Sequence, residues 1–582
     1  MLLCLAAMAG SSASAFSAMS IVSSPSTRWT RPSVLPSYQT LNMVDPKNEE
    51  GTIPITPEGV IVAEDVVNGI LGSRSGIQEV VVDDDNQASL KIRRSISDLS
   101  QAALIGVATG LAVAVFKLSI EATRVFFYEQ SILQTNPLLV VAIPLIGGAL
   151  VGLLMLLGDF PSGLRGTVEE VDQESSGAVR RTASTRLNDQ FSFIRKSAAS
   201  VVTLGTGCSL GPEGPCVELG MNVARNCMDV NIRTDSGSDR IGWNRLLLAC
   251  GAASGVAAGF NAPITGVFFA LEIMQEAFNA VDTGCPTANL NQGIASSTAR
   301  IAPVLLSSVL SAIVARYILG EHLALEVSAP ILFQAPLVEF PLYILLGVLS
   351  GAVAFSFSQL AKMSQSFFAG NIGPDSLRAT IKSVPAPTKP IIGGLVCGLV
   401  GLAFPQILFF GYGILNPLLG NNIMPTELLI TLLAAKTFAT AVAAGSGLVG
   451  GTFAPSLFLG AMTGAAFHNV MCVSITGFTD FFGIPFSDIA PVPAYALIGA
   501  GSVLAALFRA PLTGCLLIFE VARDYDIILP LMASAAVGSL FGDILDAKIE
   551  RVKLRKRRDQ DAVSWGDLSS KSKPEMPPPP PS

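Results

Sequence analysis

Two sequence patterns occur in the same order in both halves of this chain. Residues 205–220, GTGCSLGPEGPCVELG, align without gaps with residues 445–460, GSGLVGGTFAPSLFLG. Further along, FNAPITGVFFALEIM at 260–274 matches FRAPLTGCLLIFEVA at 508–522. Chance is a poor explanation for two motifs repeated in one order, so we expect two structurally related halves. Paired segments interrupted by Gly and Pro predict a transporter type of fold, with its binding site where the halves meet.

The composition is typical of a membrane protein. Half of the 582 residues are hydrophobic and 14% are charged, whereas soluble chains carry about 25% charged residues. From Gln101 to Asp546, apolar stretches alternate with short polar or Gly/Pro-rich breaks. A bilayer tolerates such breaks only where the backbone is buried in protein or lines a polar cavity. The clearest apolar stretches are residues 101–120, 137–157, 246–276, 301–318, 340–360, 388–407, 427–443 and 493–545.

The two ends of the chain differ from this apolar middle. Leu2 to Ala9 form an apolar run too short to span a bilayer, and a Ser- and Pro-rich stretch without acids continues to Asp45. This order predicts a secretory signal followed by a plastid transit peptide, with an ordinary secretory signal as the alternative. Basic residues after Asp546 predict a C-terminus on the cytoplasm-like side, or simply a solvated tail. The expected parts are a leader at 1–44, an acidic disordered arm at 45–98, membrane repeats at 99–320 and 321–546, and a basic, Pro-rich tail at 547–582.

The Cys and His residues form no recognisable metal or catalytic motif. Three of the nine Cys lie in apolar runs and are expected to be small buried hydrophobes: Cys250, Cys397 and Cys515. The only two His are His322 and His468, so neither a zinc site nor a His-based triad is expected. The turn around Ser446 resembles the nucleophile turn of an intramembrane protease, but neither His lies in a recognisable motif. We therefore expect no enzyme, no metal and no cofactor.

The repeated Gly-rich breaks have the chemistry of an anion site. A break that leads directly into a helix leaves backbone N–H groups unpaired at the helix start, and the helix dipole adds partial positive charge there. Together they bind an anion without a full positive charge, which lets the anion leave again. Gly211 and Gly451 permit close backbone approach, and Pro215 and Pro455 suit the first helical turn. Packing of helices through small residues is the alternative, but it does not explain the Gly-x-x-x-Pro spacing.

Glu213 differs from everything else in the repeat. A carboxylate within a membrane segment is costly and marks a functional site by default. Its counterpart in the second half is Phe453, so the acid is not part of the shared scaffold. At a helix start that binds anions, a carboxylate would occupy the place of the anion, and protonation or competition would move it aside. We therefore expect Glu213 to be a gate, with a buried acid that pairs with an unidentified base as the alternative.

These motifs resemble those of the CLC family of chloride channels and proton-coupled anion exchangers, over roughly residues 100–546. Residues 211–215 resemble the family motif GxEGP, which implies that Glu213 is the gating glutamate and, in exchangers, the external proton glutamate. Residues 451–455 resemble GxFxP, whose backbone amides coordinate the central anion, and 161–165 stand where the family has GSGIP. The implied anion-binding residues are Ser162, which is associated with chloride preference, together with Gly163, Leu164, Gly211, Pro212, Gly214, Thr452, Phe453 and Ala454.

The resemblance also implies an architecture and partners. The family fold is an all-α polytopic homodimer with many short, tilted and broken helices, inverted-topology halves and one pore per subunit. The expected partners are chloride or another small anion, the lipid bilayer and a second copy of the chain, and no nucleic acid. Many eukaryotic members carry C-terminal CBS domains, but we expect none here, because only a basic, Pro-rich stretch follows Asp546.

Three departures from the family pattern bear on the transport mechanism. Exchangers usually carry an internal proton glutamate at the position of Ile273, whereas Glu272 has the repeat counterpart Glu520 and is expected to be scaffold. The tyrosine that contacts the central anion from the last helix is absent from 542–552, and Glu550 or Arg551 falls near its place. Arg165 replaces the last residue of GSGIP and either contacts an anion or faces water. We expect a passive chloride channel, with a proton-coupled antiporter that uses Glu213 alone as the alternative.

Overall fold

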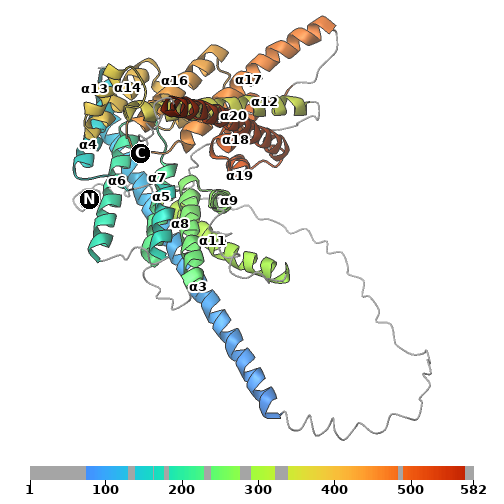
Figure 1. The fold of residues 1–582 in the computed structure, drawn as a ribbon. Coiled ribbons are helices and arrows are strands. Elements are labelled where there is room, and N and C mark those ends of the chain that lie inside the picture. Colours follow the sequence, from blue (N-terminus) through green and yellow to red (C-terminus); the bar gives the residue numbers. More distant parts are fainter. Residues whose placement is uncertain are drawn as a thin grey trace, which may run out of the picture. The chain divides into compact units, whose positions relative to one another are not determined.

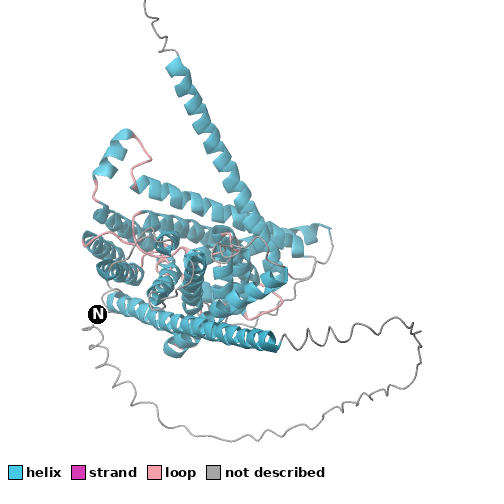
Figure 2. Cartoon of the chain, turned by 60° about the horizontal axis from the view of Figure 1, so that its bottom comes forward, coloured by secondary structure: helices cyan, strands magenta, loops and turns pink. Residues whose placement is uncertain are grey.

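The described part of the chain is built almost entirely from helices (Figures 1 and 2). The computed structural model describes residues 74–128, 138–161, 163–175, 183–228, 237–274, 290–320, 339–482 and 489–569. Within these ranges there is no strand, and the only extended pairing is an isolated antiparallel bridge between Gly211 and Gly451. The leader expected at 1–44 lies outside the described residues. The arm expected at 45–98 is described only from Arg74, where the first helix begins.

The described helices are divided between the two halves of the chain. The first half contains α3 (Arg74–Tyr128), α4 (Leu138–Leu156), α5 (Leu164–Ser175), α6 (Ala183–Gly205), α7 (Glu213–Met228), α8 (Gly237–Phe260), α9 (Pro263–Ile273) and α11 (Leu290–Leu319). The second half contains α12 (Phe340–Phe368), α13 (Asp375–Ser383), η4 (Ala386–Thr388), α14 (Lys389–Ala403), η5 (Pro405–Ile407), α15 (Tyr412–Leu419), α16 (Thr426–Gly445), α17 (Phe453–Phe482), α18 (Val492–Phe508), α19 (Pro511–Ala522) and α20 (Ile528–Ser569).

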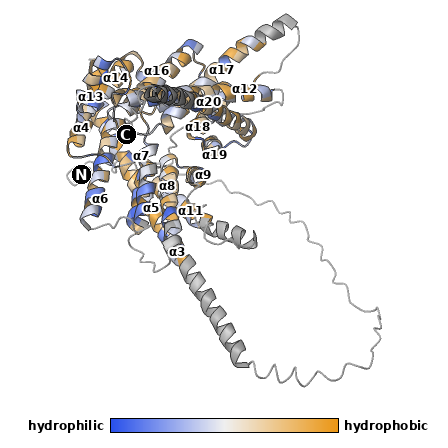
Figure 3. Cartoon of the chain, viewed as in Figure 1, coloured by the Kyte–Doolittle hydropathy of each residue, from blue (hydrophilic) through white to orange (hydrophobic). Residues whose placement is uncertain are grey.

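Eight of the described helices are long and apolar enough to cross a membrane. Apolar residues, orange in Figure 3, cover most of their length, whereas α5 and α6 carry blue, hydrophilic residues. All but one of these spans overlap an apolar stretch predicted from the sequence. The exception is Phe453–Ile475, which has a mean hydropathy of 1.4, among the lowest of the eight, and begins at the Gly/Pro break. The chain is therefore an integral, multi-pass membrane protein.

Two of the apolar stretches of the sequence each contain more than one helix. The stretch 246–276 divides into α8 and α9, and 493–545 divides into α18, α19 and α20. The cause is the same in both halves. Asn261 and Arg509 adopt the left-handed conformation, with φ of 58° and 56°, and end their helices. Pro263 and Pro511 then start the next helices, because proline suits the first helical turn but not a helix interior.

The sequence repeat corresponds to a repeat of packing. In the first half α7 packs on α8 and α8 on α9, and in the second half α17 packs on α18 and α18 on α19. The α7–α8 contact is so close that a Cβ on Gly220 would collide with the carbonyl of Gly251. A Cβ on Gly460 would collide in the same way with the carbonyl of Gly499 in the α17–α18 contact. The aligned glycines of the repeat thus bring equivalent helix pairs together.

Glu272 and Glu520 make reciprocal contacts between the halves. Near the end of α9, the Glu272 carboxylate accepts hydrogen bonds from the amides of Leu512 and Thr513 at the start of α19, at 2.9 and 2.7 Å. Glu520 near the end of α19 does the same for the start of α9, also at 2.9 and 2.7 Å. Each glutamate therefore caps the helix of the other half, a two-fold arrangement that supports the interpretation of Glu272 as scaffold.

Candidate functional site

The two repeated motifs meet at the bridge between the halves. The amide of Gly211 donates to the carbonyl of Gly451, and the amide of Gly451 donates to the carbonyl of Gly211, both at 2.7 Å. Directly after these glycines, α7 begins at Glu213 and α17 at Phe453. A Cβ on Gly451 would lie 2.7 Å from the amide nitrogen of Gly214, so only glycine fits this close approach. The sequence-predicted residues 211–214 and 452–454 are thus brought together at two adjacent helix starts.

The side chain of Glu213, the first residue of α7, lies between the two helix starts, and Glu213 is only 3% exposed. One carboxylate oxygen, Oε2, accepts a hydrogen bond from the backbone amide of Ala454 in the first turn of α17, at 3.3 Å. The other, Oε1, accepts a hydrogen bond from the hydroxyl of Tyr412 at the start of α15, at 3.0 Å. The carboxylate of the first half therefore uses a backbone donor of the second half that the sequence assigns to an anion.

A cavity leads to this carboxylate. It has a volume of about 1100 Å3, and Glu213, Tyr412 and Lys117 are among the residues that line it. The ammonium group of Lys117 on α3 donates to the carbonyl of Gly259 at the end of α8. A cation with this anchor adds positive charge to the cavity, which favours the approach of an anion.

Tyr412 is a site residue that the sequence reasoning missed. The resemblance places the tyrosine of the anion site on the last helix, near Glu550 and Arg551, but both of these residues are exposed on α20. Tyr412 instead stands in the break between two apolar stretches, flanked by Gly411 and Gly413. An aromatic side chain with a hydroxyl inside a Gly-rich break of a membrane segment was the available signal.

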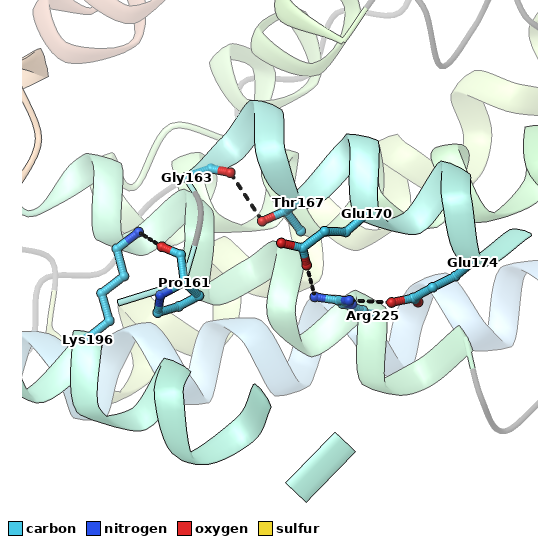
Figure 4. A network of polar contacts seen from close by, with 7 residues as sticks. All are labelled: Pro161, Gly163, Thr167, Glu170, Glu174, Lys196 and Arg225. Atoms are coloured by element: carbon cyan, nitrogen blue, oxygen red, sulfur yellow. Dashed lines mark hydrogen bonds and ion pairs between the residues drawn. The ribbon is translucent and has the colours of Figure 1, made fainter. Parts of the chain in front are cut away.

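The third predicted loop lies beside α7. Ser162 and the side chain of Arg165 are outside the described residues, so neither prediction about them is tested. Around them, the ammonium group of Lys196 on α6 donates to the carbonyl of Pro161 at 3.1 Å, and the hydroxyl of Thr167 donates to the carbonyl of Gly163 at 3.3 Å (Figure 4). Leu164 is half-buried against the hydrophobic core.

Ion pairs fasten the helix that follows this loop. The guanidinium of Arg225 on α7 binds Glu170 at 2.9 Å and Glu174 at 2.5 Å, both on α5 (Figure 4). Arg245 on α8 binds Asp172 on α5 at 2.7 Å. Because these pairs join α5 to α7 and α8, the loop before α5 is held against the helix that carries Glu213.

Ile273, which stands where exchangers usually have the internal proton glutamate, makes apolar contacts. Ile273 is half-buried at the end of α9 and packs against the main hydrophobic core. The carboxylate of its neighbour Glu272 is occupied by the amides and hydroxyl of α19. Ile273 has no carboxylate, and the carboxylate of Glu272 is already hydrogen-bonded, so neither residue offers a free acid.

The protease alternative finds no matching geometry among the described residues. The hydroxyl of Ser446 donates to the carbonyl of Ala443 in its own helix, at 2.9 Å. The ring of His468 packs against Tyr495, with centroids 5.3 Å apart, and no contact joins it to Ser446 in the described part of the chain. His322 lies outside the described residues. Cys250, Cys397 and Cys515 are buried, as expected.

A helical membrane protein of two related halves, with paired helix starts at their contact and one buried carboxylate between them, has the architecture of an inverted-repeat channel or transporter. The family model described as "Voltage gated chloride channel" matches residues 168–543. The chain belongs to this family, the CLC family.

Individual relatives agree with this assignment. The chain is 32% identical over 459 residues to "Chloride channel protein CLC-e" of Arabidopsis thaliana, an alignment that covers 76% of this chain and 59% of the relative. It is 30% identical over 461 residues to the "H(+)/Cl(-) exchange transporter ClcA" of Yersinia pseudotuberculosis, covering 77% and 85%. The chain thus spans only about three fifths of the plant relative.

A solved structure with the same fold is titled "X-ray crystal structure of a slow cyanobacterial Cl-/H+ antiporter". It is 24% identical, covers 79% of this chain and 97% of its own, and superposes with a TM-score of 0.60. At this identity the likeness concerns the fold, and it confirms the expected all-α, broken-helix architecture.

Proposed function

We propose that this protein is a passive transmembrane channel for chloride or a similar small anion, gated by Glu213. The observation that carries the proposal is the hydrogen bond from the Ala454 amide to the Glu213 carboxylate. A negatively charged group already rests on a backbone donor at a helix start, where anions bind. An anion that replaces the carboxylate would use the same donor.

The gate follows from competition for this place. While Glu213 is ionised and seated, it fills the site and blocks the path. Protonation removes its charge and its attraction to the amide, and a high anion concentration competes with it directly. We expect flux to rise at acid pH and with anion concentration on the side from which Glu213 is displaced.

A passive channel is favoured over an exchanger by Ile273 and Glu272. Ile273 has no group that carries a proton, and the carboxylate of Glu272 caps α19. A proton that reaches Glu213 would have no acid at the usual internal position to continue to. Proton movement coupled to each anion is therefore not expected.

The second candidate is a proton-coupled antiporter that uses Glu213 alone, favoured by the exchanger names of some relatives. The reversal potential of the purified protein in a planar bilayer, measured under a chloride gradient with and without a pH gradient, separates the two. For a channel the reversal potential follows chloride alone. A shift when only the pH gradient changes would refute the channel and support the antiporter.

Location and assembly complete the proposal. The leader composition at 1–44 supports a plastid membrane, either thylakoid or envelope, over another endomembrane or the plasma membrane. Membership of the CLC family supports a homodimer in which each subunit conducts by itself. Anion competition in flux assays with chloride, nitrate and fluoride tests the preferred ion.

A further inference from the structure

We propose that the second half supplies the Tyr412 hydroxyl as a hydrogen-bond donor of the anion site. This hydroxyl holds the Glu213 carboxylate in place while the gate is closed, and it faces the anion once the carboxylate has moved away. This inference deepens the proposed function and depends on it. Its starting point is the 3.0 Å hydrogen bond from the Tyr412 hydroxyl to Oε1 of Glu213. Tyr412 and Ala454 thus bind the two oxygens of one carboxylate from two different helix starts.

The position of Tyr412 in the repeat supports this role. In chain order α4, α5, α6 and α7 of the first half correspond to α14, α15, α16 and α17 of the second. The loop before α5 carries Ser162, the side-chain ligand expected from the sequence, and Tyr412 stands at the start of α15. In the sequence, a residue with a hydroxyl thus stands at or just before the corresponding helix in each half.

A buried lysine fixes the loop that presents Tyr412. Lys436 on α16 is fully buried, and its ammonium group donates to the carbonyls of Ile407 and Phe409, both at 2.8 Å. Its equivalent in the first half is Lys196 on α6, which binds the carbonyl of Pro161 before α5. In each half a lysine therefore donates hydrogen bonds to the loop that precedes the corresponding helix.

The local backbone leaves Tyr412 little freedom. Phe409 and Gly411 both have positive φ, 57° and 88°, so the chain turns sharply just before the tyrosine. A Cβ on Gly411 would collide with the ring of Phe458, which makes glycine necessary at this turn. A donor held in this way is pre-organised, so little entropy is lost when a carboxylate or an anion binds to it.

In the described part of the chain, four charged or titratable groups face Glu213. They are Tyr412 from α15, Lys117 from α3, Lys436 from α16 and Cys216 from its own helix. Among the described residues, only the Tyr412 hydroxyl makes a side-chain hydrogen bond to the carboxylate. Removing that hydroxyl therefore removes a specific stabilisation of the ionised, seated gate.

The test is chloride efflux from liposomes that contain the purified full-length protein, recorded over a pH series. In Tyr412→Phe the pH of half-maximal flux should move to more alkaline values by about one to two units. The estimate comes from the usual strength of hydrogen bonds to charged groups and from the free energy per pH unit. The direction follows because the hydroxyl stabilises the ionised carboxylate, so that without it protonation occurs at a higher pH.

Tyr128→Phe is the matched control. The Tyr128 hydroxyl donates to the carbonyl of Thr206 at 3.0 Å, and its ring contacts Phe409 at 4.9 Å. It has the same chemistry close to the same loops, but it makes no hydrogen bond to Glu213. A Tyr412→Phe profile that shifts no more than the Tyr128→Phe profile, or shifts to acid pH, would overturn the inference.

Two further arms keep the result decisive. Replacement of Tyr412 by a ring-fluorinated tyrosine keeps the shape and strengthens the donor, so the profile should move to acid pH. This variant decides the question if Tyr412→Phe does not fold. Glu213→Gln separates the two levels of the proposal. If its flux still follows pH as in the wild type, the gate itself is wrong, whereas a flat Glu213→Gln profile with an unshifted Tyr412→Phe profile refutes only the role of Tyr412.

Discussion

The starts of α7 and α17 have equivalent backbones but chemically different side chains, an acid in α7 and an aromatic ring in α17. At the first, Glu213 binds the Tyr412 hydroxyl and the Ala454 amide. At the second, the centroid of the Phe453 ring lies 4.9 Å from that of the Phe260 ring and 5.1 Å from that of the Phe508 ring. The backbone retains the two-fold relation, whereas the side chains break it, so that only one of the two helix starts carries a titratable side chain.

The aromatic side of this comparison is itself symmetric. Phe260 and Phe508 are aligned in the second repeat motif, and each ends its helix before the Ala-Pro break. Phe453 thus stands between two equivalent rings, one from each half. Aromatic pairs at these distances are attractive beyond the area that they bury, which favours a fixed position for Phe453. If Glu213 is the proposed gate, the site combines a fixed ring from one half with a movable acid from the other.

The sharpest way to break this comparison is to remove the acid. Glu213→Ala should give flux that no longer depends on pH and that exceeds the wild-type flux at alkaline pH by at least about tenfold. This lower bound follows because even one charge-assisted hydrogen bond of the seated carboxylate contributes about 1.5–3 kcal/mol, and about 1.4 kcal/mol is a factor of ten. Liposome flux over a pH series measures it.

The control for this variant is another acid of the same helix. Glu218→Gln alters a residue that pairs with Lys196 at 2.8 Å, five positions further along α7. It should retain the pH dependence of the wild type. A pH response that survives Glu213→Ala but disappears in Glu218→Gln would place the gate on the wrong residue.

The equivalent lysines sharpen the comparison at the level of stability. Lys436→Met leaves two carbonyls without their donor in a fully buried place, and each unsatisfied group costs about 1–3 kcal/mol. Lys196→Met leaves one carbonyl and Glu218, whose side chain is 24% exposed and can be hydrated. Thermal unfolding in detergent should therefore show the larger loss for Lys436→Met. An equal or reversed order would show that the two loops are not held in the way inferred here.

The sequence predicted the parts of this site that local patterns encode. The Gly/Pro breaks predicted helix starts at Glu213 and Phe453. Because Glu213 aligns with Phe453, the sequence also identified an acid that occurs in one half only. Hydropathy alone did not locate the helix ends at Asn261 and Arg509, because it does not register a single left-handed residue. The Ala-Pro that follows each of them was the local signal.

The contacts between distant segments were beyond such patterns. Tyr412 lies 199 residues from Glu213, and no periodicity relates the two. Lys436 was open to prediction, because it stands as far ahead of Gly451 as Lys196 stands ahead of Gly211. A lysine inside an apolar stretch is unusual in membranes and has a specific partner as a rule. The repeat therefore contained more information than the two motifs alone.

The smallest expected effect concerns the pair that keeps its symmetry, Glu272 and Glu520. Because each carboxylate caps the helix of the other half through the same pair of amides, Glu272→Gln and Glu520→Gln should lower the stability equally, by about 0.5–2 kcal/mol. Thermal unfolding measures this loss, and the reversal potential under a pH gradient should not change in either variant. If Glu272→Gln alone alters the response to pH, Glu272 carries protons in place of the acid missing at Ile273, and the two halves differ at a second point.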